Sequence, residues 1–128
     1  MGKAEGVISY ERARIGDADP LIVDKQPFIL VSKDSDFSSM VADGILGLGF
    51  KLLSDNYDTF MDTLYKNRKI SKQVFSIFLS DNDFGAKSVE LPESNIIIGD
   101  YDLKTYASPE NVTWLKVYKS TGYWVTYN

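Results

Sequence analysis

The segment Asp43-Gly44-Ile45-Leu46-Gly47-Leu48-Gly49-Phe50 is the most distinctive stretch of this sequence. Its glycines follow the order G-x-x-G-x-G, which is not the dinucleotide-binding order, and no Gly-Lys-Ser/Thr ending follows, so a phosphate-binding loop is excluded. Glycine interleaved with aliphatic residues instead predicts a strand and a tight loop where backbones approach closely. We expect Ile45, Leu46 and Leu48 to pack inward from this segment.

Most of the sequence outside this segment has the character of short strands. A strand is expected over residues 6–15, and an Asp-rich turn at residues 16–20 separates it from two apolar runs over residues 21–32. Pro27 lies between those runs and predicts a bulge, a turn or an edge position. Further strands are expected over residues 74–79, 96–98, 112–119 and 122–127, with turns at 81–85 and 99–100. The fold class expected is therefore mainly β.

One short amphipathic helix is expected near residues 56–67. Its apolar residues recur at the spacing i, i+3, i+4 and i+7, in the order Tyr57, Phe60, Met61 and Leu64. This spacing places them on one face of a helix. Asp55 or Asn56 is expected to cap the N-terminus.

The charged residues of this helix are expected to face solvent. Asp58 and Asp62 are four residues apart, which puts them on one exposed helix face. Lys66, Arg68 and Lys69 gather at the C-terminal end, where cations complement the helix dipole. We interpret this basic cluster as a solvated helix end and not as a phosphate or nucleic-acid site.

Composition narrows the classes of function. The 128 residues, 44% hydrophobic and 25% charged, are enough for one globular domain or part of one. A net charge of −4 disfavours nucleic acid and anionic membranes as partners. The chain has no cysteine and no histidine, which excludes Ser-His-Asp, Cys-His and zinc-hydrolase chemistry. No signal peptide and no apolar run of about 18 residues is visible. Carboxylate chemistry remains, or no chemistry.

The acidic clusters are better explained as turns than as metal sites. Asp34-Ser35-Asp36 and Asp81-Asn82-Asp83 begin like calcium loops, but neither has glycine at the sixth position or glutamate at the twelfth. Aspartate and asparagine are common turn residues. We therefore expect neither a metal nor a cofactor, although a calcium-binding β domain remains a minor hypothesis that a calcium titration would test.

Taken in order, these segments resemble the pepsin-like aspartic endopeptidases, the family of pepsin, cathepsin D and plasmepsin. The stretch 37–50 resembles the family's Phe-Asp-Gly-Ile-Leu-Gly-Leu-Gly/Ala-aromatic segment, and Ile70 to Leu79 resembles its Val/Leu-Phe-Ser-hydrophobic-Tyr/Phe-Leu strand. Ile96 to Asp102 is similar to its Gly-Gly turn, although Gly99-Asp100 stands where the family usually has Gly-Gly. The Tyr123-Trp124 pair is nearly a signature of the later strands.

The resemblance implies an incomplete domain. Residues 1–128 resemble the second part of the N-terminal lobe, from just after the flap to the interlobe connection, in a fold of closed-barrel-like β-sheets. Family catalysis uses two Asp-Thr/Ser-Gly loops whose carboxylates share a proton and activate a water. The sequence contains neither Asp-Thr-Gly nor Asp-Ser-Gly. We therefore expect no catalytic residue in this chain, and whether it belongs to an active enzyme stays open at this point.

The resemblance also assigns supporting roles to particular residues. Ile45 matches a position that lines the non-primed substrate pocket, Phe37 aligns loosely with another, and Tyr123 matches a primed-side pocket residue. Leu46 and Gly47 belong to the hydrophobic-hydrophobic-Gly element that, in the family, holds the catalytic loop. Ordinary core packing is the alternative interpretation of Ile45, Phe37 and Tyr123.

Two functions are consistent with the sequence. In the first, the chain is a segment of an aspartic-type endopeptidase, inactive alone, that supplies scaffold and pocket wall while the remaining protease lobes complete a site for polypeptide substrates. In the second, it is a stand-alone, non-catalytic pepsin-fold module that binds peptides or inhibits a partner. The resemblance to this family implies a lysosomal, vacuolar or secreted location. Asn111-Val112-Thr113 matches the N-glycosylation sequon, which makes Asn111 a candidate glycosylation site.

Overall fold

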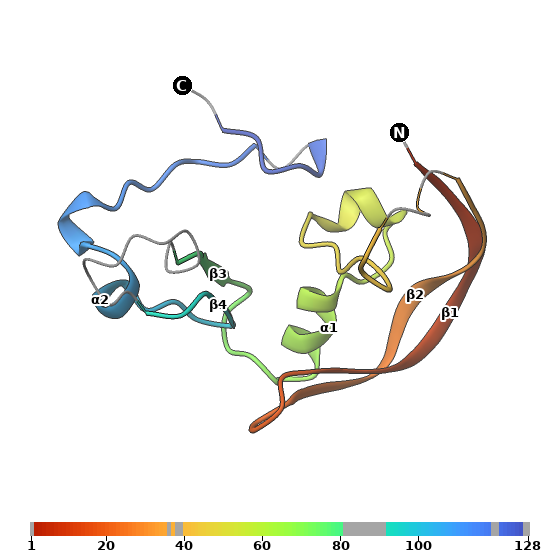
Figure 1. Cartoon of the computed structure of the whole chain (residues 1–128), viewed down its shortest axis with the longest axis horizontal. Coiled ribbons are helices and arrows are strands. Elements are labelled where there is room, and N and C mark those ends of the chain that lie inside the picture. Colours follow the sequence, from red (N-terminus) through yellow and green to blue (C-terminus); the bar gives the residue numbers. More distant parts are fainter. Residues whose placement is uncertain (1, 36, 38–39, 81–91, 119–120, 127–128) are drawn as a thin grey trace.

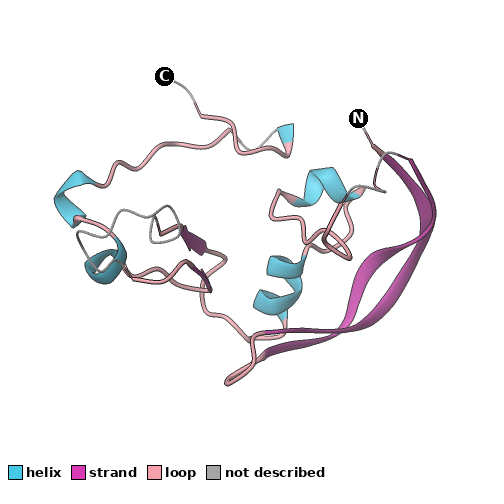
Figure 2. Ribbon diagram, viewed as in Figure 1, coloured by secondary structure: helices cyan, strands magenta, loops and turns pink. Residues whose placement is uncertain are grey.

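The computed structural model describes residues 2–35, 37, 40–80, 92–118 and 121–126 (Figure 1). In chain order the elements are β1 (Lys3–Ile15), β2 (Leu21–Ser35), the 3-10 helix η1 (Lys51–Ser54), α1 (Phe60–Lys66), β3 (Phe75–Phe78), β4 (Asn95–Ile98), α2 (Leu103–Tyr106) and the 3-10 helix η3 (Pro109–Asn111). The fold is mainly β, as predicted. The strands form two separate two-stranded sheets, and no closed barrel occurs in the part of the chain that is described (Figure 2).

β1 and β2 form a long antiparallel hairpin that begins earlier and ends later than the sequence predicts. Its turn begins at Gly16, whose φ of 87° is a backbone conformation that favours glycine. Pro27 pairs with Tyr10 in this two-stranded sheet, in agreement with an edge position. The register shifts twice, and each time the extra residue lies in β2, so that β1 runs regularly along its whole length. Lys25, with a φ of 57°, lies at one of these bulges.

α1 begins later than the sequence predicts. Thr59 is the N-cap: its hydroxyl accepts a hydrogen bond from the Asp62 amide, and the Asp62 carboxylate accepts one from the Thr59 amide. This reciprocal capping box satisfies two amides that would otherwise lack partners. The prediction that Asp55 or Asn56 caps the helix is wrong, because both have positive φ (49° and 63°) in the link after η1.

The end of α1 is a Schellman motif. Arg68 has a φ of 55° and its amide donates to the Tyr65 carbonyl, while the Lys69 amide donates to the Leu64 carbonyl. The chain thereby reverses direction and places Ile70 back against the helix, where its side chain is buried.

The core lies where α1 meets the turn end of the β1–β2 hairpin and the sheet of β3 and β4. Its buried hydrophobic residues are Val23, Phe60, Met61, Leu64 and Ile70. Partly buried side chains from β1, β2, β3 and β4, together with Leu48, pack against this cluster. Figure 1 shows α1 between the curved hairpin on one side and β3 and β4 on the other. The predicted apolar helix face is confirmed for Phe60, Met61 and Leu64, whereas Tyr57 precedes the helix and is 39% exposed.

β3 and β4 pair antiparallel, from Phe75 opposite Ile98 to Phe78 opposite Asn95. Gly99 follows β4 with a φ of 89°, and a Cβ added there would lie 2.6 Å from Cγ2 of Ile70. The next residue, Asp100, accepts a hydrogen bond from the Lys72 ammonium at 3.0 Å, which lowers the pKa of the Asp100 carboxyl. The turn predicted after Ile98 is therefore present, and it requires glycine at its first position.

The C-terminal part of the chain differs from the sequence prediction. Residues 112–118 and 121–126 form no named strand, and the strands expected over 112–119 and 122–127 are reduced to one bridge between Val117 and Thr126. Figure 1 shows this segment crossing above the rest of the molecule after η3. The residues have strand propensity, but no neighbouring strand in the described part of the chain supplies the cross-strand contacts that stabilise a sheet.

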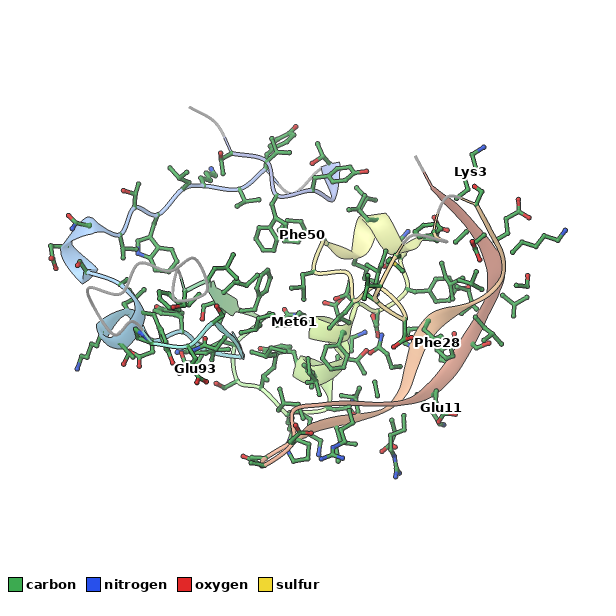
Figure 3. The ribbon with its side chains drawn as sticks, viewed as in Figure 1. Lys3, Glu11, Phe28, Phe50, Met61 and Glu93 are labelled. Carbon is green, nitrogen blue, oxygen red and sulfur yellow. The ribbon has the colours of Figure 1, made fainter. Side chains whose placement is uncertain are left out.

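The molecule exposes far more surface than a compact protein of its mass. Its accessible surface is 10651 Å², whereas a folded monomer of 14.4 kDa has about 6,800 Å². Exposed apolar side chains are spread over the hairpin, the glycine-rich segment and the C-terminal segment (Figure 3). Among the described residues, no helix has both the length and the apolar character needed to cross a membrane.

Candidate functional site

The glycine-rich segment is open to solvent at its centre. Ile45 is 75% exposed and Leu46 is 51% exposed, and the Cβ positions of Gly44 and Gly47 have no neighbouring atom within 4 Å. The prediction that Ile45 and Leu46 pack inward is therefore wrong, because no described part of the chain covers them. Leu48 is the aliphatic residue of the segment that does pack against the core.

Trp124 joins the glycine-rich segment to the C-terminal segment. Its indole Nε1 donates a hydrogen bond to the Leu48 carbonyl at 2.8 Å. Its ring packs against Phe50, with centroids 4.5 Å apart, and meets Phe75 of β3 edge-on at 5.6 Å. The Phe50 amide also donates to the Gly122 carbonyl at 3.0 Å. We call this set of contacts the Trp124 clamp. The sequence does not predict it, because the hydrogen bond joins residues 76 positions apart.

The Trp124 clamp places Tyr123, one of the predicted pocket residues, close to the glycine-rich segment that contains Ile45, another predicted pocket residue. Tyr123 adjoins Trp124 and is 62% exposed, with its amide donating to Thr121 Oγ1 at 3.3 Å. Ile45 and Leu46 lie just before Leu48 in the segment to which Trp124 is bound. The structure thus brings together the two segments that carry Ile45 and Tyr123, with both side chains exposed.

Phe37 lies elsewhere. It follows β2 at the open end of the hairpin and is half-buried, with its ring so close to Gly2 that an added Cβ there would lie 2.8 Å from ring atom Cε2. The neighbouring residues 36 and 38–39 lie outside the described part of the chain. No described contact connects Phe37 to the Trp124 clamp.

Asp58 lies just before α1 and Asp62 within it, and both carboxylates have structural partners, contrary to the expectation that both are simply exposed on one helix face. Asp58 accepts hydrogen bonds from Lys51 at 2.7 Å and from Lys66 at 2.5 Å. Hydrogen bonds from Lys51 and then Lys66 lower the pKa of the Asp58 carboxyl. Asp62 is occupied by the capping box and also accepts a hydrogen bond from Gln73 at 2.8 Å. A carboxylate held ionised by two ammonium groups is a poor proton donor, so Asp58 is unsuited to general acid catalysis.

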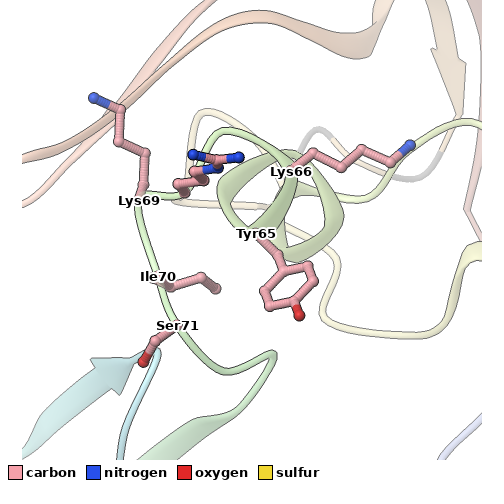
Figure 4. Close-up of a pocket in the computed structure, with 6 residues that line it drawn as sticks. Tyr65, Lys66, Lys69, Ile70 and Ser71 are labelled. Carbon is pink, nitrogen blue, oxygen red and sulfur yellow. The ribbon is translucent and has the colours of Figure 1, made fainter.

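The basic residues after α1 line an open pocket of about 690 Å³ together with Tyr65, Ile70 and Ser71 (Figure 4). Lys66 is already paired with Asp58. Figure 4 shows Lys66 and Lys69 pointing in different directions from the helix end. Because their ammonium groups do not converge on one point, the pocket offers no anion cradle, in keeping with a solvated helix end.

The remaining candidate positions have simple surroundings. In the described part of the chain, no group of three acidic residues lies close enough to hold a metal ion. Asp34 is in β2, while Asp36 and the whole Asp81-Asn82-Asp83 cluster lie outside the described residues. Asn111 lies at the end of η3, and its side chain is exposed, so a glycan could be attached to it.

Comparison with known proteins defines the class. The model of the eukaryotic aspartyl protease family matches residues 1–127, and the chain belongs to this family. Gastricsin of Cavia porcellus is 31% identical over 96% of this chain, and rhizopuspepsin-1 of Rhizopus niveus is 27% identical over 94% of it. Cathepsin D of Clupea harengus is 29% identical over 86%. The chain covers 29%, 29% and 26% of these relatives respectively, less than a third of the length of each. No solved structure gives a match.

Proposed function

We propose that this chain is one part of an aspartic-type endopeptidase that hydrolyses polypeptides at acidic pH. The complete enzyme uses two aspartate carboxylates that share a proton and activate a water for attack on the peptide carbonyl. One observation carries the proposal: the family match extends over residues 1–127, yet the sequence has no Asp-Thr-Gly or Asp-Ser-Gly. The rest of the protease, outside this chain, therefore supplies both carboxylates, and this chain alone is inactive.

In that enzyme the chain supplies a scaffold and part of the pocket wall. Ile45 and Phe37 contribute to the non-primed side and Tyr123 to the primed side. Leu46 and Gly47 support a catalytic loop. The exposure of Ile45, Leu46 and Tyr123 supports these roles, because apolar side chains that contact another segment or a substrate are left uncovered in this part by itself. The open space around Gly47 is compatible with another loop packing there.

The surface of the molecule favours this proposal over the stand-alone binding module. An excess of about 3,800 Å² on this one chain over a compact monomer is larger than the roughly 800 Å² that each partner contributes to a standard interface, and larger than half of the roughly 2,000–5,000 Å² of an obligate one. A self-sufficient module would cover most of that surface itself. We therefore take the remaining protease lobes as the partners of this chain, with polypeptide substrate bound through the complete enzyme.

The location that we propose is lysosomal, vacuolar or extracellular. Proteases of this family that act at acidic pH need an acidic compartment or an acidic exterior. The exposed Asn111 in its sequon supports a route through the secretory pathway, where glycans are added. Mass spectrometry of the protein purified from its natural source would test this, because an unmodified Asn111 removes that support.

Two measurements test the function. The purified chain is assayed for acid-pH cleavage of a fluorogenic peptide, with pepsin as the positive control and a pepstatin-type inhibitor as the specificity control. We expect no inhibitor-sensitive turnover, and such turnover would mean that the carboxylates have been assigned wrongly. The gene is then sequenced on both sides of this segment. In-frame Asp-Thr/Ser-Gly codons on each side support the protease, and a start codon at Met1 with a stop codon after Asn128 favours the binding module.

A further inference from the structure

Tyr123, the residue proposed for the primed side, is held in place through its two chain neighbours. The carbonyl of Gly122 accepts a hydrogen bond from the Phe50 amide at 3.0 Å. The indole of Trp124 donates to the Leu48 carbonyl at 2.8 Å. Both bonds end in the glycine-rich segment, so Tyr123 cannot shift relative to that segment unless one of them breaks.

The two segments meet at a pair of glycines. A Cβ added to Gly49 would lie 3.5 Å from the carbonyl oxygen of Gly122 and 3.0 Å from Cδ1 of Leu53 in η1. Gly122 is buried and has a φ of 76°, and a Cβ there would lie 2.8 Å from Cγ of the same leucine. Glycine at both positions lets the two backbones approach closely. The separation between the segments is therefore short and well defined.

The backbone of Tyr123 bonds within its own segment. Its amide donates to Thr121 Oγ1 at 3.3 Å, and its carbonyl accepts the Val125 amide at 3.0 Å. The second bond closes a γ-turn with Trp124 at its centre. In the described part of the chain, no hydrogen bond joins Tyr123 itself to the glycine-rich segment. Its place beside that segment depends on its neighbours.

Trp124 also provides the contact to the core. Its ring packs on Phe50 and meets Phe75 of β3 edge-on, with centroids 4.5 Å and 5.6 Å apart, and Phe75 packs against the buried cluster. Figure 3 shows Phe50 directly below the C-terminal segment. One side chain thus touches both the glycine-rich segment and the small sheet, and it belongs to the residue next to Tyr123.

We propose that Trp124 is a positioning residue, which sets the place of Tyr123 relative to Ile45 and so couples the two sides of the substrate pocket. The pocket roles of Tyr123 and Ile45 rest on the proposed function, whereas their relative placement follows from the contacts of the clamp. Leu48 packs against the core and anchors the segment of Ile45. When the clamp loosens, Tyr123 is therefore the residue that moves, and the primed-side residues of a polypeptide substrate are the ones discriminated.

Spin labels test the placement in the 128-residue chain itself. The chain has no cysteine, so Ile45→Cys/Tyr123→Cys carries labels at these two positions only. Pulsed electron paramagnetic resonance then gives the distribution of distances between them. Adding Trp124→Phe keeps an aromatic ring and removes the indole N–H. We expect a broader distribution, in which the population at the parent distance falls about fivefold relative to the rest, the value of one hydrogen bond.

Trp114→Phe, added to the same labelled chain, is the matched control. Trp114 lies in the same C-terminal segment, but its ring packs against Tyr101 outside the clamp. The control should leave the distribution of distances unchanged. An unchanged distribution with Trp124→Phe, or equal broadening with Trp114→Phe, overturns the proposal.

Peptide cleavage tests the consequence in the complete protease, expressed from the gene with its flanking codons. Two peptides are compared that differ only after the scissile bond, where one has bulky apolar residues and the other has alanine. Trp124→Phe should lower kcat/KM about fivefold for the first peptide and less than about twofold for the second. An equal loss for both peptides would mean that Trp124 serves stability alone, and it overturns the proposal.

Failure of the proposed function has a different signature. A gene that encodes no further lobes, or a complete product without pepstatin-sensitive activity, refutes the protease. The labelled chain still decides whether Trp124 positions Tyr123, because that measurement needs neither substrate nor the rest of the enzyme.

Discussion

Replacing Gly99 by alanine should strongly destabilise the chain. Gly99 has a φ of 89°, and an added Cβ would lie 2.6 Å from Cγ2 and 2.8 Å from Cβ of Ile70, which is buried in the core. Placing a non-glycine residue in left-handed backbone costs about 1–2 kcal/mol, and overpacking a core adds roughly 1–3 kcal/mol. We expect Gly99→Ala to lower the free energy of unfolding by about 2–5 kcal/mol, measured by urea unfolding followed by tryptophan fluorescence.

Gly47→Ala is the matched control, because the same substitution meets nothing within 4 Å there. It should change the free energy of unfolding by less than about 0.5 kcal/mol. Ile70→Ala removes the nearer of the two clashing atoms, so the double variant Gly99→Ala/Ile70→Ala should lose less than the sum of the single losses. Equal stabilities for Gly99→Ala and Gly47→Ala, or strict additivity of the pair, would refute the close contact between this turn and the core.

Three further substitutions address the helix and the clamp. Thr59→Ala removes the N-cap of α1 and should cost about 1 kcal/mol, whereas Thr59→Ser keeps the hydroxyl and should cost much less; thermal unfolding of the two variants measures the difference, and equal losses contradict the capping role. Asp58→Asn should be less stable than the parent at pH 7. Folding lowers the pKa of the Asp58 carboxyl, so its ion pairs stabilise the fold fully at pH values above the ordinary Asp pKa of about 3.9. That stabilisation is lost as the pH falls through the lowered pKa. The two proteins should therefore converge in stability as the pH falls through the lowered pKa of Asp58, and a difference that stays constant as the pH is lowered contradicts the ion-pair assignment. Trp124→Phe keeps a ring but loses the hydrogen bond to the Leu48 carbonyl; it should cost about 1 kcal/mol and shift the backbone NMR signals of the glycine-rich segment, and unchanged signals there contradict the clamp.

The sequence predicts well those elements whose stabilising contacts lie close along the chain. Phe60, Met61 and Leu64 recur with the helical period and are buried together, and β1, β2, β3 and β4 form where apolar runs predict strands. The start that the sequence predicts for α1 is too early, because Asp55 and Asn56 are good caps by type. The capping box of Thr59 depends on the reciprocal bond from Asp62, which a search for cap residues alone overlooks.

Elements that need distant or external partners could not be predicted in the same way. Val117 and Thr126 have strand propensity but meet only in one bridge, because propensity without neighbouring strands does not make a sheet. Ile45 has the composition of a core residue and is 75% exposed, since apolar character does not specify which segment covers a side chain. The hydrogen bond between Trp124 and Leu48 spans 76 positions, a separation at which no local pattern carries a signal.

The Trp124 clamp also sets the order in which the chain assembles and comes apart. Closing a loop of 76 residues costs roughly 4 kcal/mol of chain entropy. This offsets most of what the two hydrogen bonds and two ring contacts of the clamp supply at roughly 1 kcal/mol each. The clamp can therefore close only on a core already formed around Leu64. Local unfolding should begin with the C-terminal segment, so that residues 112–126 behave as a cooperative unit of low stability that docks last and releases first.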